Sequence, residues 1–204
     1  MSSSFTTAEQ MLASLDADWR QLIAQVGPCT LSAKQQSPYE SLIRAIASQQ
    51  LHGKAAEAIL ARLLTLYSAQ FPSPQQLANA SFEELRSCGF SSNKVLSMQA
   101  IAQASLAGEI PDLIQAKQMK DSELIQCLTQ LRGVGQWTVE MMLIFNLGRM
   151  DVLPVDDYGV RMGYQRLKNL DQIRPKQLQI IGEQWAPYRT IAAWYLWRVP
   201  KNNA

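Results

Sequence analysis

The chain has 204 residues, 47% of them apolar, and a formal net charge of +2, so it is long enough to bury one good core or two small ones. No apolar stretch approaches the roughly 20 residues that span a bilayer, and residues 1–5 lack the basic and apolar pattern of a leader, which predicts neither secretion nor a membrane partner. Three widely spaced cysteines, Cys29, Cys88 and Cys127, exclude a disulfide framework and a metal cluster.

Helical periodicity runs through almost the whole chain and predicts an all-α fold. Apolar residues recur at spacings of three and four, as in 42–47 and 56–64. In a capping box, a serine side chain and an acid or amide three residues later satisfy free backbone amides. Such boxes start at Ser37, Ser73 and Ser81, and further helices are expected near Asp121, after Pro154, at Pro175 and at Pro187. The total is roughly nine or ten helices without a long linker.

Residues 128–143 have the pattern of a helix, a Gly-x-Gly turn and a second helix. Glycine at both turn positions, Gly133 and Gly135, permits a positive φ and lets the backbone approach another molecule, and Val134 is expected to plug the turn. The second helix would then present unpaired amides to a DNA phosphate without reading base sequence. A purely structural turn between packed helices is the alternative.

Two adjacent acids, Asp156 and Asp157, stand at the start of a further helix. The spacing from Asp157 through Val160 to Tyr164 follows one helix face, so we expect Asp157 to point towards a site and Asp156 to cap the helix. Capping combined with compensation of the helix dipole is the alternative for the pair.

Charge is distributed unevenly along the chain. Residues 1–90 carry 6 Lys and Arg against 7 Asp and Glu, whereas residues 91–204 carry 13 against 10. The second half is therefore the expected DNA-facing half, although an ordinary solvated surface gives the same pattern.

These features together resemble the helix-hairpin-helix base-excision DNA glycosylases, specifically their 3-methyladenine DNA glycosylase II branch. The resemblance covers residues 37–198 and rests on five blocks in the family's order. The blocks are AIASQQLHGKAA at 45–56, GFSSNK at 89–94, the hairpin at 128–143, PVDDY at 154–158, and WAPYR at 185–189 with WYLW at 194–197.

The resemblance implies two compact helical subdomains flanking a DNA-binding cleft. The first would span residues 38–148 and end in the helix-hairpin-helix, and the second would join residues 1–37 to 149–204. It also implies a monofunctional glycosylase that flips an alkylated purine, 3-methyladenine or 7-methylguanine, out of duplex DNA and hydrolyses its N-glycosidic bond in base excision repair. We expect a monomer, cytoplasmic and nucleoid-associated in a bacterium or nuclear in a eukaryote.

By resemblance, Asp157 is the catalytic residue, because a carboxylate near C1′ stabilises an oxocarbenium-like transition state and orients water. Trp137, Trp197 and Tyr158 would line the base pocket, where aromatic faces attract a cationic base. Packing in the core is the alternative for each tryptophan. Relatives that also cut the strand carry a lysine at the position of Trp137, so no lyase activity is expected.

The remaining resemblance concerns contacts to DNA and to a cation. Gln50 and Leu51 would fill the space left by the flipped base. Further DNA contacts are expected from His52, Lys54, Ser91, Lys94, Gly133, Gly135, Gln136 and Thr138. Backbone carbonyls of Thr129, Leu131 and Val134 would hold a structural monovalent cation. No other cofactor is expected, and the iron–sulfur cluster of some relatives is excluded because no cysteine follows Cys127.

Two other functions fit parts of the same pattern. A non-catalytic helix-hairpin-helix module would hold the DNA backbone and give Asp157 no special task. A glycosylase of the same superfamily for mispaired or oxidised bases would act on undamaged mispairs or oxidised guanine.

Overall fold

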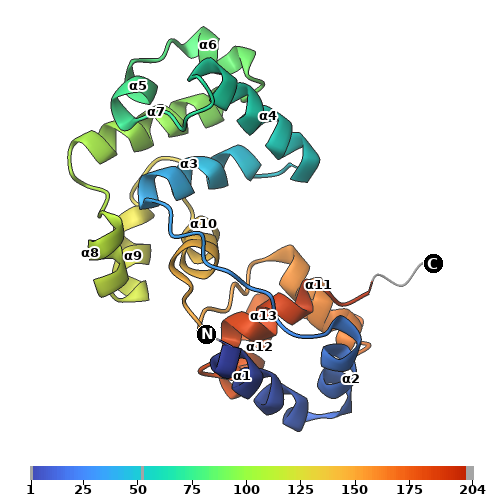
Figure 1. The fold of residues 1–204 in the computed structure, drawn as a ribbon. Coiled ribbons are helices and arrows are strands. Elements are labelled where there is room, and N and C mark those ends of the chain that lie inside the picture. Colours follow the sequence, from blue (N-terminus) through green and yellow to red (C-terminus); the bar gives the residue numbers. More distant parts are fainter. Residues whose placement is uncertain (1, 52, 201–204) are drawn as a thin grey trace. The chain divides into compact units, whose positions relative to one another are not determined.

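The computed structural model describes residues 2–51 and 53–200, and over those residues it contains helices and no strand, which confirms the all-α prediction. The chain divides into two compact units (Figure 1). We call residues 34–147 the hairpin unit, and residues 1–33 with 148–204 the terminal unit. None of the described helices combines the length and the apolar character needed to cross a membrane.

The unit boundaries differ from the predicted ones at residues 34–37 and 148. The backbone N–H of Lys34 donates to the carbonyl of Phe145 at 3.0 Å. The Asn146 side chain accepts from the backbone N–H of Gln36 at 2.6 Å and donates to its carbonyl at 2.8 Å. This pairing places residues 34–37 in the hairpin unit. It joins two residues that are 110 positions apart in the chain, and local sequence patterns cannot predict such a contact.

The hairpin unit is built from short, individually capped helices. Its elements are α3 (Pro38–Ser48), α4 (Gly53–Leu66), α5 (Pro74–Asn79), α6 (Phe82–Ser87), α7 (Ser92–Leu106), α8 (Leu113–Gln118), α9 (Asp121–Leu128), α10 (Gln136–Met142) and a π-helix (Leu143–Leu147). With the terminal unit, the described residues form thirteen α-helices, more than the roughly nine or ten expected. Six-residue helices such as α8 are too short to show a clear period.

Local sequence sets several of these helix starts. Ser73 forms a complete capping box with Gln76, and Ser81 begins another. At Ser37 only one half of the box forms: the hydroxyl accepts from the backbone N–H of Glu40, while the Glu40 carboxylate binds a neighbouring arginine. The predicted starts at these three serines are confirmed.

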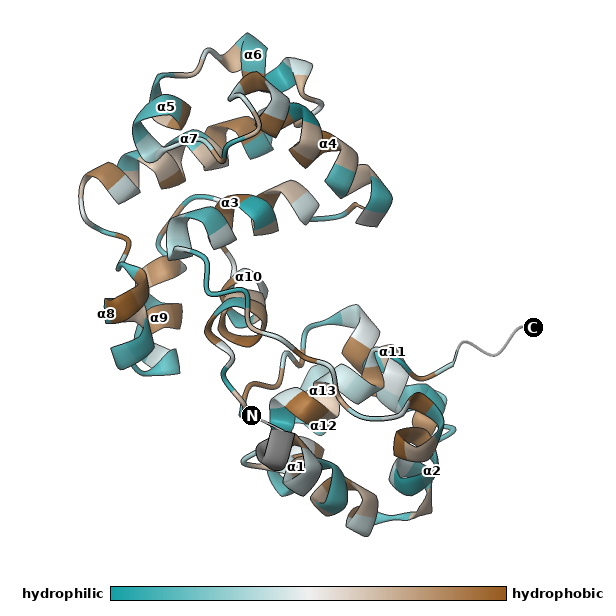
Figure 2. Ribbon diagram, in the orientation of Figure 1, coloured by the Kyte–Doolittle hydropathy of each residue, from teal (hydrophilic) through white to brown (hydrophobic). Residues whose placement is uncertain are grey.

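Helices α3 and α7 form the centre of the hairpin unit. They contact each other, while α5 packs on α7 and α10 packs on α3. Ile43 and Ile46 of α3 are buried, as are Val95, Met98 and Ile101 of α7. Figure 2 shows hydrophobic and hydrophilic stretches alternating along α4, as expected for a helix that buries one face.

The terminal unit combines the two ends of the chain. Its elements are α1 (Ser2–Leu15), α2 (Ala17–Val26), α11 (Tyr158–Leu167), α12 (Pro175–Gly182), a 3-10 turn (Glu183–Trp185) and α13 (Arg189–Leu196). Residues 190–196 of α13 are all buried. The Trp185 ring lies 5.4 Å from that of Trp19 and 5.5 Å from that of Tyr164. The Tyr195 hydroxyl donates to Glu9 at 2.9 Å, which fastens α13 to α1.

Helices α11 and α13 approach each other closely at Gly163. A Cβ on Gly163 would overlap the carbonyl oxygen of Leu196, which belongs to the backbone of α13. Because a backbone atom cannot swing aside as a flexible side chain can, only glycine fits at this crossing.

We predict that Gly163→Ala lowers the free energy of unfolding by about 1–3 kcal/mol or more, because the added methyl group must push two helices apart. Alanine favours helix over glycine, so propensity alone predicts the opposite sign. Thermal or urea unfolding of the variant measures the effect. An unfolding midpoint equal to or above that of the wild type would contradict the packing at this crossing.

Candidate functional site

Asp157 is the N-cap of α11, a place that the sequence pattern had suggested for Asp156. Its Oδ1 accepts from the backbone N–H of Val160 at 2.8 Å, and its own N–H donates to the carbonyl of Pro154 at 3.0 Å. This turn sets residue 157 at the entrance of the helix, while Asp156 is exposed. The prediction that Asp156 caps the helix is therefore wrong, because α11 begins at Tyr158 and only the residue before it can reach the N3 amide.

The same carboxylate oxygen has a second donor. The indole Nε1 of Trp197, at the C-cap of α13, donates to Oδ1 of Asp157 at 2.8 Å. Both residues are half-buried, whereas the side chain of Tyr158 is 71% exposed. The structure thus brings Asp157 and Trp197 together. The resemblance predicts Trp197 as a wall of the base pocket, and no sequence pattern indicates the contact between its side chain and that of Asp157.

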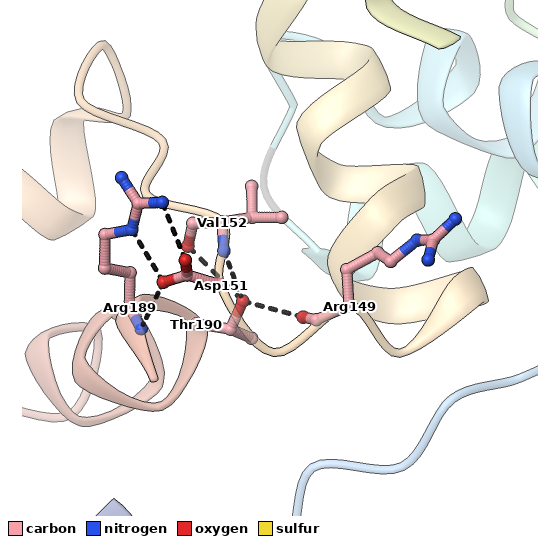
Figure 3. Close-up of polar contacts among 5 residues, drawn as sticks. All are labelled: Arg149, Asp151, Val152, Arg189 and Thr190. Atoms are coloured by element: carbon pink, nitrogen blue, oxygen red, sulfur yellow. Dashed lines mark hydrogen bonds and ion pairs between the residues drawn. The ribbon is translucent and has the colours of Figure 1, made fainter. Parts of the chain in front are cut away.

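The first residues of α13 bind the segment that leads to Asp157 (Figure 3). Arg189 donates to both carboxylate oxygens of Asp151, at 2.7 and 2.8 Å. The fully buried Thr190 hydroxyl donates to the carbonyl of Arg149 at 2.7 Å and accepts from the N–H of Val152 at 3.0 Å. In Figure 3 the Arg149 guanidinium points away from this cluster. We call these five residues the α13 clamp.

The hairpin itself runs from α9 to α10 through a turn in which the two glycines differ. Gly133 has a φ of +78°, and a Cβ there would overlap the Ser97 hydroxyl. Gly135 has a φ of −95°, and a Cβ there would meet nothing within 4 Å. Of the two glycines, only Gly133 therefore uses the positive φ that glycine permits. Val134 is buried between them, as expected for a plug.

Gln49 links this turn to α3. Its Nε2 donates to the carbonyl of Gly133 at 3.1 Å and to Oγ1 of Thr138 at 3.2 Å. Thr138 is only 1% exposed, so its side chain stabilises the hairpin from inside the unit, and its role as a DNA contact stays a prediction. Gln136, by contrast, is exposed at the start of α10.

The predicted wedge lies in the loop between α3 and α4. Gln50 is exposed and has a φ of +56°, and Leu51 is 38% exposed. Lys54, in the first turn of α4, is also exposed. His52 falls outside the described residues. The wedge and DNA-contact roles of these residues stay predictions.

Lys94 has a different environment from the one expected. Its ammonium donates to the carbonyls of Ala47 and Gln49, at 2.9 and 2.8 Å, and its partial burial lowers its pKa. A lysine at the end of a helix satisfies carbonyls that have no intrahelical partner. Lys94 therefore stabilises the end of α3 and the start of the loop that carries the predicted wedge (residues 49–51), which we call the wedge loop. The exposed Ser91 caps α7, because its hydroxyl accepts a hydrogen bond from the backbone N–H of Lys94.

A cavity of about 260 Å³ lies within the hairpin unit, between α3 and the α10 helix with its π-helical extension. Most of the surface that lines the cavity is apolar, and Trp137, Met141 and Phe145 line it from α10 and the π-helix. The remaining lining residues are Lys34, Gln36, Ser41, Arg44, Ala45, Ser48, Met142 and Asn146. π-Helical turns are rare and frequently occur at functional sites.

The predicted cation site involves only backbone carbonyls. Thr129 is the C-cap of α9, and the Leu131 carbonyl accepts from the N–H of Val134 at 3.1 Å. A carbonyl has two lone pairs, so this hydrogen bond is compatible with a monovalent cation, which stays a prediction. Among the described residues, no group of three His, Cys, Asp or Glu side chains could hold a metal ion.

Comparison with known proteins identifies the family. The model of the HhH-GPD superfamily base excision DNA repair proteins matches residues 43–187. The chain belongs to this superfamily. It is 46% identical to DNA-3-methyladenine glycosylase 1 of Schizosaccharomyces pombe, over 98% of this chain and 89% of that protein. It is 38% identical to the alkylbase DNA glycosidase-like protein mag2 of the same yeast, over 98% and 95% of the two chains.

A solved structure resembles the whole fold. The structure of S. pombe 3-methyladenine DNA glycosylase Mag1 in complex with abasic DNA matches with a TM-score of 0.89 and 45% identity. The match covers 94% of this chain and 95% of that one. The helices described above therefore follow the arrangement of a structurally characterised superfamily member.

The α13 clamp predicts a pH dependence of stability. Hydrogen bonds from Arg189 lower the pKa of Asp151 below its ordinary value of 3.8. Because the pKa of Asp151 is lower in the folded state, its ion pair with Arg189 stabilises the fold fully at pH values above the ordinary pKa. This stabilisation is lost as the pH falls through the pKa of the folded state. At neutral pH, Asp151→Asn should lower the free energy of unfolding by about 0.5–1 kcal/mol, because solvent screens a carboxylate that is 36% exposed.

Urea unfolding of wild type and Asp151→Asn at a series of pH values measures this difference. It should shrink towards zero as the pH falls below about 4. A difference between the two proteins that stays constant throughout the range below about pH 4 would contradict an ionised Asp151–Arg189 pair.

Proposed function

We propose that the protein is a monofunctional DNA glycosylase that hydrolyses the N-glycosidic bond of alkylated purines, 3-methyladenine and 7-methylguanine, in duplex DNA during base excision repair. The observation that carries the proposal is the carboxylate of Asp157, fixed at a helix start by one backbone and one side-chain donor. Membership of a base excision repair superfamily and the names of the two relatives support it.

A fixed carboxylate suits this reaction because positive charge develops on the sugar as the C1′–N bond breaks. An anion held in place before the reaction stabilises that charge without reorganising at the transition state. The carboxylate can also orient the attacking water, whose oxygen bonds to C1′. An alkylated purine starts as a cation and leaves as a neutral base with the bonding electron pair, so a general acid is not required.

The cavity in the hairpin unit has the chemistry expected for the base. Trp137 contributes an electron-rich ring face, which attracts a cation, and Met141 adds a polarisable thioether. Its volume of about 260 Å³ is slightly below the usual range for drug-sized ligand sites, roughly 300–1,000 Å³. A single planar base is a ligand of suitable size.

Strand cleavage by a Schiff base needs an amine at the reacting centre, and two of the lysines are engaged elsewhere. Trp137 follows the hairpin where lyase relatives carry lysine. The Lys94 ammonium binds two carbonyls, and that of Lys168 binds Asp16 and Asp18 at 2.6 and 2.7 Å. These contacts support base release without cutting of the strand.

We expect Asp157→Asn to reduce base release from alkylated duplex DNA at least about 100-fold, because the variant loses the negative charge that stabilises the sugar cation. Asparagine remains a good N-cap, so the fold should be retained. Binding to a duplex that contains an abasic site should change little. Full activity, or a loss of binding equal to the loss of activity, would favour the non-catalytic DNA-binding module.

A panel of duplexes tests substrate and mechanism together. We expect release of 3-methyladenine and 7-methylguanine and no release from adenine–guanine mispairs or 8-oxoguanine. Strand breaks should appear only after treatment with alkali, because hydrolysis leaves an intact abasic strand. Breaks without alkali would contradict the monofunctional reaction, and activity restricted to mispaired or oxidised bases would favour the alternative glycosylase.

A further inference from the structure

Gly159 is the second residue of α11, directly beside the Asp157–Trp197 contact. A Cβ on Gly159 would lie 2.8 Å from Cδ1 and 3.2 Å from Nε1 of Trp197, and 3.1 Å from Oδ1 of Asp157. The first of these distances is shorter than atoms of this kind can approach. An indole ring therefore occupies the space where every other residue type would have its side chain.

Backbone geometry does not require glycine at this position. The φ of Gly159 lies outside the left-handed region that favours glycine, and glycine is among the least favourable residues within a helix. An alanine would suit the first turn of α11 better if nothing lay beside it. The absence of a side chain is thus explained by the neighbouring indole.

Trp197 cannot easily move away from this contact. Its backbone N–H closes the last turn of α13 on the carbonyl of Ala193 at 3.0 Å, and the preceding residues 190–196 are buried. Only rotation of the side chain would relieve a clash at position 159, and such a rotation would break the hydrogen bond from Nε1 to Asp157.

We propose that Gly159 and Trp197 form a positioning pair for the catalytic carboxylate: the missing side chain admits the indole edge, and the indole N–H fixes the orientation of Asp157. This inference rests on the proposed function. Loss of the indole removes one of the hydrogen bonds to Oδ1 and so weakens the restraint on rotation of the carboxylate. Because catalysis depends on pre-set geometry, a small rotation at the reacting group slows the chemical step.

The test compares Gly159→Ala, Trp197→Phe and the double variant with wild type. Each single variant should lower the single-turnover rate of 7-methylguanine release about 10- to 100-fold, as expected for a lost hydrogen bond to a charged group. The dissociation constant for an abasic duplex and the thermal midpoint should stay near the wild-type values. The double variant should be no slower than Trp197→Phe alone, because both changes remove the same contact.

Trp194→Phe is the matched control, since Trp194 is on the same helix but is buried against Tyr195 and Arg198. It should lower the thermal midpoint and leave the rate per folded molecule unchanged. In the two-dimensional NMR spectrum, the indole N–H resonance of Trp197 should shift in Gly159→Ala.

The outcomes separate this inference from the proposed function. If wild type releases no alkylated base, the proposed function fails, and an unshifted Trp197 indole resonance in Gly159→Ala would refute the pair independently. If wild type is active, a wild-type rate in Gly159→Ala would overturn the pair alone. Additive losses in the double variant would likewise show that the two residues act separately.

Discussion

In the terminal unit, the position of the Asp157 segment depends on α13, which contacts that segment at both ends of the helix. At its start, Arg189 and Thr190 hold the chain at residues 149–152 through an ion pair and buried hydrogen bonds. At its end, Trp197 donates to Asp157 itself. Because the helix between these ends is buried along its length, a displacement at either end is transmitted to the carboxylate. Its orientation is therefore a property of tertiary packing and not of α11 alone.

This arrangement explains how one residue can both cap a helix and serve as a candidate catalyst. A capping carboxylate accepts a hydrogen bond from an amide of the first helical turn, which holds it in one orientation. The reaction needs an oriented carboxylate close to a developing cation. In the hairpin unit, Gln49 and Lys94 brace the turn and the wedge loop through backbone carbonyls. In both units, interactions inside the fold set the geometry of groups proposed to meet DNA.

Sequence predicted the helical class, several helix starts and the hairpin, because capping residues and periodicity are local. It assigned the cap to Asp156 instead of Asp157, since periodicity cannot distinguish which of two adjacent acids precedes the first helical residue. The internal contacts of the Thr138 and Lys94 side chains could not be predicted, because their partners are 89 residues away for Thr138 and 45 and 47 residues away for Lys94 and leave no local signal. A signal did exist for Gly159, because a glycine in the first turn of a well-capped helix is unfavourable and indicates a close neighbour.

The central claim is that the Asp157 side chain faces the deoxyribose of an extruded nucleotide while the base is bound by aromatic residues. The most direct test is a crystal structure of the inactive Asp157→Asn protein with a duplex that contains one 7-methylguanine. We expect the lesion to be flipped out of the helix, the residue 157 side chain to lie against C1′, and Trp197 still to contact residue 157. A lesion that remains stacked, or a residue 157 side chain that is turned away from the sugar, would contradict the central claim.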